Sequence, residues 1–190
     1  HNANQYADLQ GGLAVASVSG LSLYDANGDE LAVVQAKLDT PAIRTGGKLT
    51  LAFDVGGTNL LAVRQSGETA LSLTTQRPIF DADMAADGSL CYATSESGYK
   101  TVLYVYGSNQ NRIYRWLSAS QFMPVCAVSA GGKYLASVSL GQRDGIYASS
   151  LHIFQTAKED SGITAALGGD LIYDLTFLDA STICTVGESG

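Results

Sequence analysis

The sequence predicts an all-β protein, and more narrowly a β-propeller built from four-stranded antiparallel blades. Three observations predict this fold: short apolar runs fill most of the 190 residues, turn-forming residues separate the runs, and one unit repeats along the chain. Runs of about 4–8 residues bounded by Gly, Asn, Asp and Ser are typical of strands joined by tight turns. With 46% hydrophobic residues, the chain has enough apolar side chains for a core and is not a disordered tail.

The composition of individual runs favours strands over helices. β-Branched and aromatic residues fill both faces of 101–106, as expected for a strand that is covered on both sides. Asp87-Gly88 supplies the positive-φ residue that a tight hairpin turn requires. The window 108–123 also fits a helical stripe, but its neighbours are strands, so we predict a strand there.

An internal repeat supplies the strongest argument for a propeller. A strand, a turn and a second strand recur at 41–52, 79–93, 125–137 and 171–184. The turn positions are Gly47, Gly88, Gly132 and Ser181, which gives steps of 41 (88 − 47), 44 (132 − 88) and 49 (181 − 132) residues. Two further strands fit within each full step, and four strands in roughly 40–50 residues match the blade period of a propeller. Each blade would bury its faces against its neighbours.

The repeat also predicts the bounds of the blades. We expect a terminal segment at 1–12, followed by a first blade without a clear first strand at 13–35. Further blades are expected at 41–76, 78–118 and 122–166, and a partial blade at 171–186. Two arrangements fit: the chain is part of a larger ring, or the strands at 171–186 complete the first blade and close a small ring of four blades.

The charge balance excludes two classes of partner. The chain has 11 Lys and Arg against 18 Asp and Glu, a net charge of −7. Nucleic acids and anionic membrane surfaces are both bound through clustered basic residues, so neither is an expected partner. No run of about 18 apolar residues occurs, so we expect no membrane insertion within this segment.

The three cysteines form no recognisable motif. Cys91, Cys126 and Cys184 are widely spaced, without a Cys-x-x-Cys pair that would indicate a zinc ribbon or a thioredoxin-type redox site. Each lies in an apolar run, where a buried thiol is expected. Three free thiols, or one disulfide with one free thiol, both fit the sequence.

Several stretches carry a family resemblance. The segments 98–106, 112–116 and 51–57 resemble an uncharacterised family of bacterial propeller proteins from Gram-positive gut bacteria, over about 13–187. The second strand at 133–136 resembles the blades of TolB-like and WD40-like propellers, without the Trp-Asp ending of true WD40 repeats. The family resemblance implies a propeller outside the cytoplasm, held at the cell surface by an anchor upstream of this segment, and it implies no activity.

One string resembles a phosphate-binding motif. Asp54-Val55-Gly56-Gly57-Thr58 resembles the first phosphate motif of sugar kinases of the hexokinase/actin superfamily, which implies glycine N–H groups on phosphate and Asp54 on metal-bound water. No second nucleotide motif accompanies it. A Gly-Gly turn between two blade strands is the favoured interpretation.

The remaining candidates for chemistry favour structural roles. The residues 25–29 have acidic spacing, but Glu30 and Ala36 stand where an EF-hand needs Gly and Glu, so we predict a hairpin turn. His152 is the one histidine besides His1, so no multi-histidine metal cluster can form, and no Gly-x-Ser-x-Gly elbow accompanies it. We therefore expect no catalytic residue, no metal and no cofactor.

A cluster of aromatic and basic residues in the third blade is the candidate binding site. Tyr, Trp and Arg dominate binding hot spots, although the same side chains also suit packing between blades. The candidate residues are Tyr99, Lys100, Arg112, Tyr114, Arg115 and Trp116.

The favoured function is a non-catalytic module outside the cytoplasm that binds a protein or polymer through its loops. The alternative is an enzyme acting on a glycan at the central channel, which would need two carboxylates about 5–10 Å apart. Asp81, Asp83 and Asp87 are the carboxylates available for such a pair. Self-association is expected if the ring is open.

Overall fold

The computed structural model describes residues 4–143, 145–158 and 162–188, and it confirms the predicted all-β fold. Its elements in chain order are β1 (Gln5–Leu9), β2 (Gly12–Ser17), β3 (Gly20–Tyr24), β4 (Glu30–Gln35), β5 (Pro41–Gly46), β6 (Leu49–Asp54), β7 (Asn59–Arg64), β8 (Thr69–Thr74), β9 (Ile79–Met84), β10 (Leu90–Glu96), β11 (Tyr99–Tyr106), β12 (Arg112–Ser118), β13 (Phe122–Val128), the 3-10 turn η1 (Ala130–Gly132), β14 (Tyr134–Arg143), β15 (Ile146–Gln155), β16 (Ile163–Gly168), β17 (Ile172–Phe177) and β18 (Ile183–Gly187).

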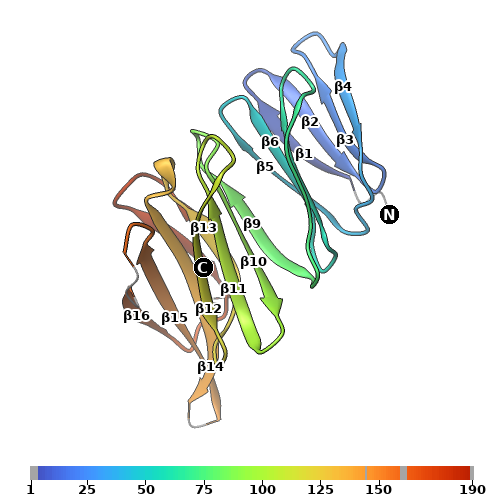
Figure 1. Ribbon diagram of the computed structural model, residues 1–190. Coiled ribbons are helices and arrows are strands. Elements are labelled where there is room, and N and C mark those ends of the chain that lie inside the picture. The colour runs from blue at the N-terminus through green and yellow to red at the C-terminus, as the bar shows by residue number, and fades with distance from the viewer. Residues whose placement is uncertain (1–3, 144, 159–161, 189–190) are drawn as a thin grey trace. The chain divides into compact units, whose positions relative to one another are not determined.

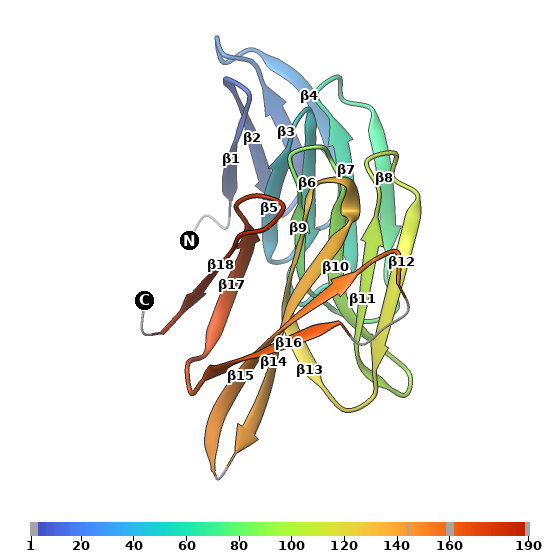
Figure 2. The ribbon, with the colours of Figure 1, turned by 90° about the vertical axis from the view of Figure 1, so that its left-hand side faces the viewer.

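Consecutive strands pair as antiparallel meanders (Figure 1). Four sheets of four strands follow one another, and we name them blade 1 (β1–β4), blade 2 (β5–β8), blade 3 (β9–β12) and blade 4 (β13–β16). The strands β17 and β18 form a fifth, two-stranded sheet (Figure 2). The predicted turn glycines lie at positive φ, with Gly47 at 59°, Gly88 at 86° and Gly132 at 63°, which explains why glycine recurs at these turns.

The chain divides into two units, His1–Ile79 with Ala86–Gly88, and Phe80–Ala85 with Ser89–Gly190. In the first unit, β1 and β2 of blade 1 lie against β5 of blade 2. Leu9, Leu21 and Leu23 from blade 1 join Ile43 and Leu61 from blade 2 in one buried cluster. Each of these two blades therefore covers an apolar face of the other.

The second unit repeats this arrangement in two apolar layers. Between blades 3 and 4, Leu103 and Cys91 pack with Leu135 and Phe154. On the other face of blade 4, Val138 and its neighbours pack against β17 and β18. A single sheet of four strands cannot bury both faces alone, and here the neighbouring sheets supply the missing contacts.

Two expectations about the first blade were wrong. The segment 1–12 contains β1, which pairs with β2 from Gln5–Ala16 to Leu9–Gly12 and so gives blade 1 a first strand. The sequence signal of β1 is weak because its inward side chains are only Ala7 and Leu9. Closure by 171–186 completing blade 1 is also wrong, since blade 1 has four strands of its own and β17 pairs with β18.

Candidate functional site

The predicted binding residues divide between the two faces of blade 3. Tyr114 and Trp116 pack into the apolar layer between blades 3 and 4, where the Trp116 ring lies 4.8 Å from the Phe154 ring, measured between centroids. Arg112 and Arg115 lie on the opposite face, over the ring of Tyr104. Packing between blades, the alternative given for the aromatic residues, accounts for Tyr114 and Trp116.

A bulge decides the side on which Arg112 lies. Simple alternation along β12 would place Arg112 with Tyr114 and Trp116. The register shifts between Val105 and Tyr106 on the partner strand, so Arg112 stands opposite Tyr106 instead. Bulges re-aim side chains in this way, and here the bulge brings the two arginines to one face.

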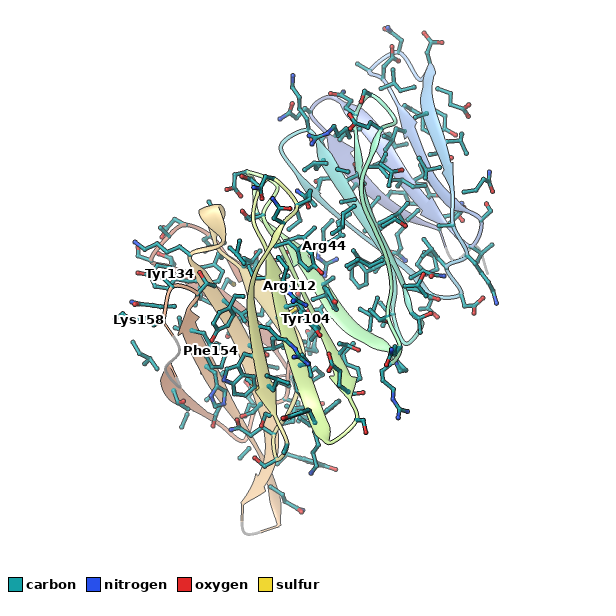
Figure 3. The ribbon with its side chains drawn as sticks, in the orientation of Figure 1. Arg44, Tyr104, Arg112, Tyr134, Phe154 and Lys158 are labelled. Atoms are coloured by element: carbon teal, nitrogen blue, oxygen red, sulfur yellow. The ribbon has the colours of Figure 1, made fainter. Side chains whose placement is uncertain are left out.

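The face opposite blade 4 carries a compact tyrosine–arginine cluster. Its members are Tyr92, Glu96, Tyr104, Tyr106, Arg112 and Arg115. The Tyr92 ring is stacked on Tyr104 at a centroid distance of 4.9 Å and on Tyr106 at 6.2 Å. The guanidinium carbons of Arg112 and Arg115 lie 5.7 and 5.6 Å from the centroid of the Tyr104 ring, within cation–π range. Figure 3 labels Arg112 and Tyr104.

Glu96 closes a hydrogen-bonded network inside the cluster. The Tyr104 hydroxyl donates to Glu96 Oε1, and Arg115 Nη2 donates to Glu96 Oε2 at 2.5 Å. Burial, and then the hydrogen bond to Glu96, raises the pKa of Tyr104, while burial raises the pKa of Tyr92. Both phenols therefore stay protonated near neutral pH and act as packing and hydrogen-bonding groups, not as bases.

Arg112 differs from Arg115 in having no ion pair with any carboxylate among the described residues. Its side chain is exposed, and the Tyr104 ring below it limits its orientation. Ile113, 46% exposed, follows it on β12. Tyr99, which pairs with Glu96 at the β10–β11 hairpin, is 41% exposed. Ile113 turns toward Gly132 and Val105 on the blade 4 side, and Tyr99 lies at the opposite end of β11 from Tyr106. The exposed cation of Arg112 is therefore separate from both of these apolar side chains.

The structure brings together some predicted residues and not others. Arg112 and Arg115 share the cluster, and Tyr99 adjoins it through Glu96. Lys100 is exposed at the start of β11, next to Tyr99. Tyr92 and Glu96 were missed by the sequence analysis. The signal that finds them is the hairpin register, in which Tyr92 stands opposite Tyr104.

The carboxylates considered for an enzyme accept hydrogen bonds from the backbone of the neighbouring blade. Asp81 and Asp83 alternate along β9, and their Oδ2 atoms accept the N–H groups of Cys126 at 3.0 Å and Val128 at 3.1 Å. Both donors lie on β13, the edge strand of blade 4, where the N–H groups have no ladder partner. The two carboxylates therefore cap a sheet edge across the blade boundary.

The string at 54–58 forms the turn between β6 and β7, as favoured. Gly56 N–H donates to the Ile79 carbonyl at 2.8 Å, and Gly57 N–H donates to the Asp54 carbonyl at 3.1 Å. Asp54 Oδ1 accepts the N–H of Thr40 at 2.6 Å and is buried. The groups that would hold a phosphate are thus used within the protein, and the sugar-kinase-like alternative was wrong.

The acidic residues at 25–29 form the predicted hairpin turn. Asp25 Oδ1 accepts the N–H groups of Asn27 at 2.8 Å and Asp29 at 2.9 Å, which lowers the pKa of Asp25, chiefly through the Asp29 bond. Across residues 4–143, 145–158 and 162–188, no group of three or more His, Cys, Asp or Glu could hold a metal ion.

His152 is packed inside blade 4, between β14 and β16. Its Nε2 lies 2.8 Å from the Ser139 hydroxyl and its Nδ1 lies 3.1 Å from the Thr164 hydroxyl. The side chain is 6% exposed, and burial lowers its pKa. Both ring nitrogens therefore have hydroxyl partners, as expected for a satisfied core histidine.

The burial of His152 predicts a pH dependence of stability. The unfolded chain takes up the proton near pH 6.5, whereas the folded chain resists it, so stability is full above about pH 6.5 and falls as the pH is lowered through that value. At pH 5.5 the loss amounts to at most about 1.4 kcal/mol. Urea unfolding at pH 7.5 and 5.5 should show a smaller difference in His152→Gln than in the native chain. An equal difference in both proteins would contradict the role of His152.

The comparisons with known proteins agree with this architecture. Four-stranded antiparallel sheets that follow one another along the chain define a β-propeller fold. The chain belongs to the family of unknown function DUF5711, whose model matches residues 1–190. No curated protein matches it.

Solved propellers share the fold at low sequence identity. The chain is similar to KlHsv2 with loop 6CD replaced by a Gly-Ser linker, at TM-score 0.67 and 12% identity over 98% of this chain and 62% of that one. It is also similar to the beta-propeller domain of Myceliophteria thermophila Cps50 (Swd1), at TM-score 0.69 and 10% identity over 98% and 63% of the chains. The Neurospora crassa Pan2 WD40 domain is similar at TM-score 0.61 and 14% identity, over 98% of this chain and 59% of that one. This chain spans less than two thirds of each.

Proposed function

We propose that this chain is a non-catalytic propeller module that binds a protein partner through the exposed end of blade 3. The observation that carries the proposal is the position of Arg112, an exposed guanidinium held over the Tyr104 ring without a carboxylate partner among the described residues. Arg and Tyr are among the residue types enriched at protein interfaces. WD40-like folds offer such surfaces at their blade edges and loops.

The engagement of the candidate catalytic groups supports a non-catalytic role. Asp81 and Asp83 accept backbone N–H groups, and both nitrogens of His152 face hydroxyl groups. A general acid or base must be able to reach its substrate, and these groups are held within the blades. Nothing in this arrangement favours the glycan-cleaving alternative.

The pre-organisation of Arg112 supports the choice of surface. An arginine that is already restrained by an aromatic ring loses less rotamer freedom when it binds. A partner carboxylate would supply the negative charge that pairs with the Arg112 guanidinium.

A binding measurement with matched charge reversals tests the proposal. The full chain is immobilised, and envelope proteins from the cells that produce it are passed over it. We expect binding that weakens by at least about tenfold in Arg112→Glu and stays within about twofold in Lys158→Glu, which reverses an exposed cation of blade 4 (Figure 3). Equal affinity of the two variants would contradict the proposed surface. Release of sugar from a panel of fluorogenic glycosides would instead support the enzyme.

We also propose that the module lies outside the cytoplasm. The support is the resemblance of 98–106 and 51–57 to propellers that are anchored at the cell surface. Within the described residues, no helix is long and apolar enough to cross a membrane. Labelling of intact cells with a membrane-impermeant amine reagent should modify this protein and spare a cytoplasmic marker; labelling only after lysis would contradict the location.

A further inference from the structure

Two buried thiols meet at the boundary between blades 3 and 4. Cys91 lies on β10 and Cys126 on β13, and their exposed fractions are 0% and 1%. The two side chains belong to the same apolar layer, and the strands that carry them, β10 and β13, are in direct contact. The Cys126 thiol also lies 3.8 Å from the carbonyl oxygen of Asp81.

We propose that Cys91 and Cys126 form a disulfide that joins blade 3 to blade 4 when the chain folds under oxidising conditions. The two residues stand on facing sheets whose strands β10 and β13 are in contact, and each side chain points toward the other sheet. A disulfide between packed sheets is an established way of linking two β-layers. The proposal goes beyond the proposed binding function and does not depend on Arg112.

The third cysteine, Cys184, is an internal control for the disulfide. Cys184 lies on β18, belongs to the two-stranded sheet, and has its sulfur 3.9 Å from the Thr185 carbonyl oxygen. It is only partly buried, and its neighbours are not the layer that holds Cys91 and Cys126. We therefore expect Cys184 to remain a thiol.

The chemistry requires a disulfide oxidant such as oxidised glutathione. One cysteine attacks the glutathione disulfide as its thiolate and releases one reduced glutathione, which leaves a mixed disulfide. The second cysteine then attacks that mixed disulfide and releases a second reduced glutathione. Two thiol protons leave the protein, and two electrons pass to glutathione.

Burial of the two thiols determines the stage of folding at which the disulfide can form. It raises the pKa of the Cys91 thiol and raises that of Cys126 well above its usual value, so the thiolate fraction in the folded chain is small. The same burial keeps the oxidant away from both sulfurs. The bond is therefore expected to form while the chain folds, and only slowly once the blades have packed.

Refolding of the full chain under a glutathione redox buffer tests the proposal. The chain is unfolded in urea, refolded with oxidised and reduced glutathione, and alkylated, and its tryptic peptides are analysed without reduction. Cleavage after Lys and Arg places the three cysteines on separate peptides, because they are separated by Lys100, Arg115, Lys133 and Lys158. We expect the Cys91 and Cys126 peptides to be linked and Cys184 to be alkylated.

The stability of the oxidised chain provides a second measurement. The bond closes a loop that spans 35 positions (126 − 91), which should lower the unfolding equilibrium constant at least about tenfold relative to the reduced chain. Cys184→Ser should show the same link and the same shift, whereas Cys126→Ala should show neither. A link that contains Cys184, or three alkylated cysteines after oxidative refolding, would overturn the proposal.

Discussion

Replacing Phe154 with alanine is expected to lower the free energy of unfolding by about 3–5 kcal/mol, the usual cost of removing a large aromatic side chain from a core. Phe154 is 0% exposed and lies on β15, opposite Leu135 of β14. Its ring is 4.8 Å from that of Trp116 on β12, so it belongs to the core of two blades at once. The cavity would therefore weaken the packing of blade 3 on blade 4 as well as the sheet itself.

Urea unfolding measures this effect, with Ile163→Ala as the control. Ile163 is on β16 of the same blade and is 70% exposed, so its truncation should cost less than about 1 kcal/mol. Equal losses in the two variants would show that blades 3 and 4 do not share a core. If Phe154→Ala fails to fold, Phe154→Leu keeps most of the apolar volume, and we expect an intermediate loss.

The sequence was sufficient for the fold because local signals and the repeat agree. Gly88 was predicted as a turn residue, and its φ of 86° shows why a glycine stands there. The strand preferred within 108–123 is confirmed as β12. The run 101–106 has β-branched and aromatic residues at both alternating positions, and its first five residues are buried in the structure.

The candidate site was harder to predict because its geometry is not local. The position of Arg112 depends on a register shift between β11 and β12, and alternation along one strand cannot predict it. Glu96 enters the cluster through the register of β10 with β11. Trp116 was attractive as a binding residue by type alone, yet its side chain packs against Phe154.

The roles of Asp81 and Asp83 could not be predicted from the sequence, because their hydrogen-bond partners are also not local. Their acceptor atoms face N–H groups 45 residues further along the chain, in the next blade. An acidic residue on the innermost strand of a propeller therefore has two interpretations, chemistry in the channel or capping of the neighbouring edge. The bonds to Cys126 and Val128 favour the second.

Alanine at both Asp81 and Asp83 is expected to lower the free energy of unfolding by about 2–6 kcal/mol, because each substitution leaves one N–H group of β13 without its acceptor at about 1–3 kcal/mol. The control is Asp39→Ala, which removes the same charge from a side chain that is 72% exposed and forms a surface ion pair with Lys37. Asparagine at either position retains a carbonyl oxygen that can accept the bond, so Asp81→Asn and Asp83→Asn should each cost less than the corresponding alanine.

Hydrogen exchange resolves the effect at single amides and separates edge capping from general loss of stability. Asp83→Ala should speed the exchange of the Val128 amide, and Asp81→Ala that of the Cys126 amide, each more than it speeds Ser129, whose N–H donates to the Tyr134 carbonyl at 3.0 Å. If exchange instead rises equally at all three amides, the carboxylates stabilise the unit only globally and do not cap the edge. If exchange and stability are both unchanged in the double variant, the two carboxylates do not cap this edge. The glycan-cleaving enzyme would then be the better account of this propeller.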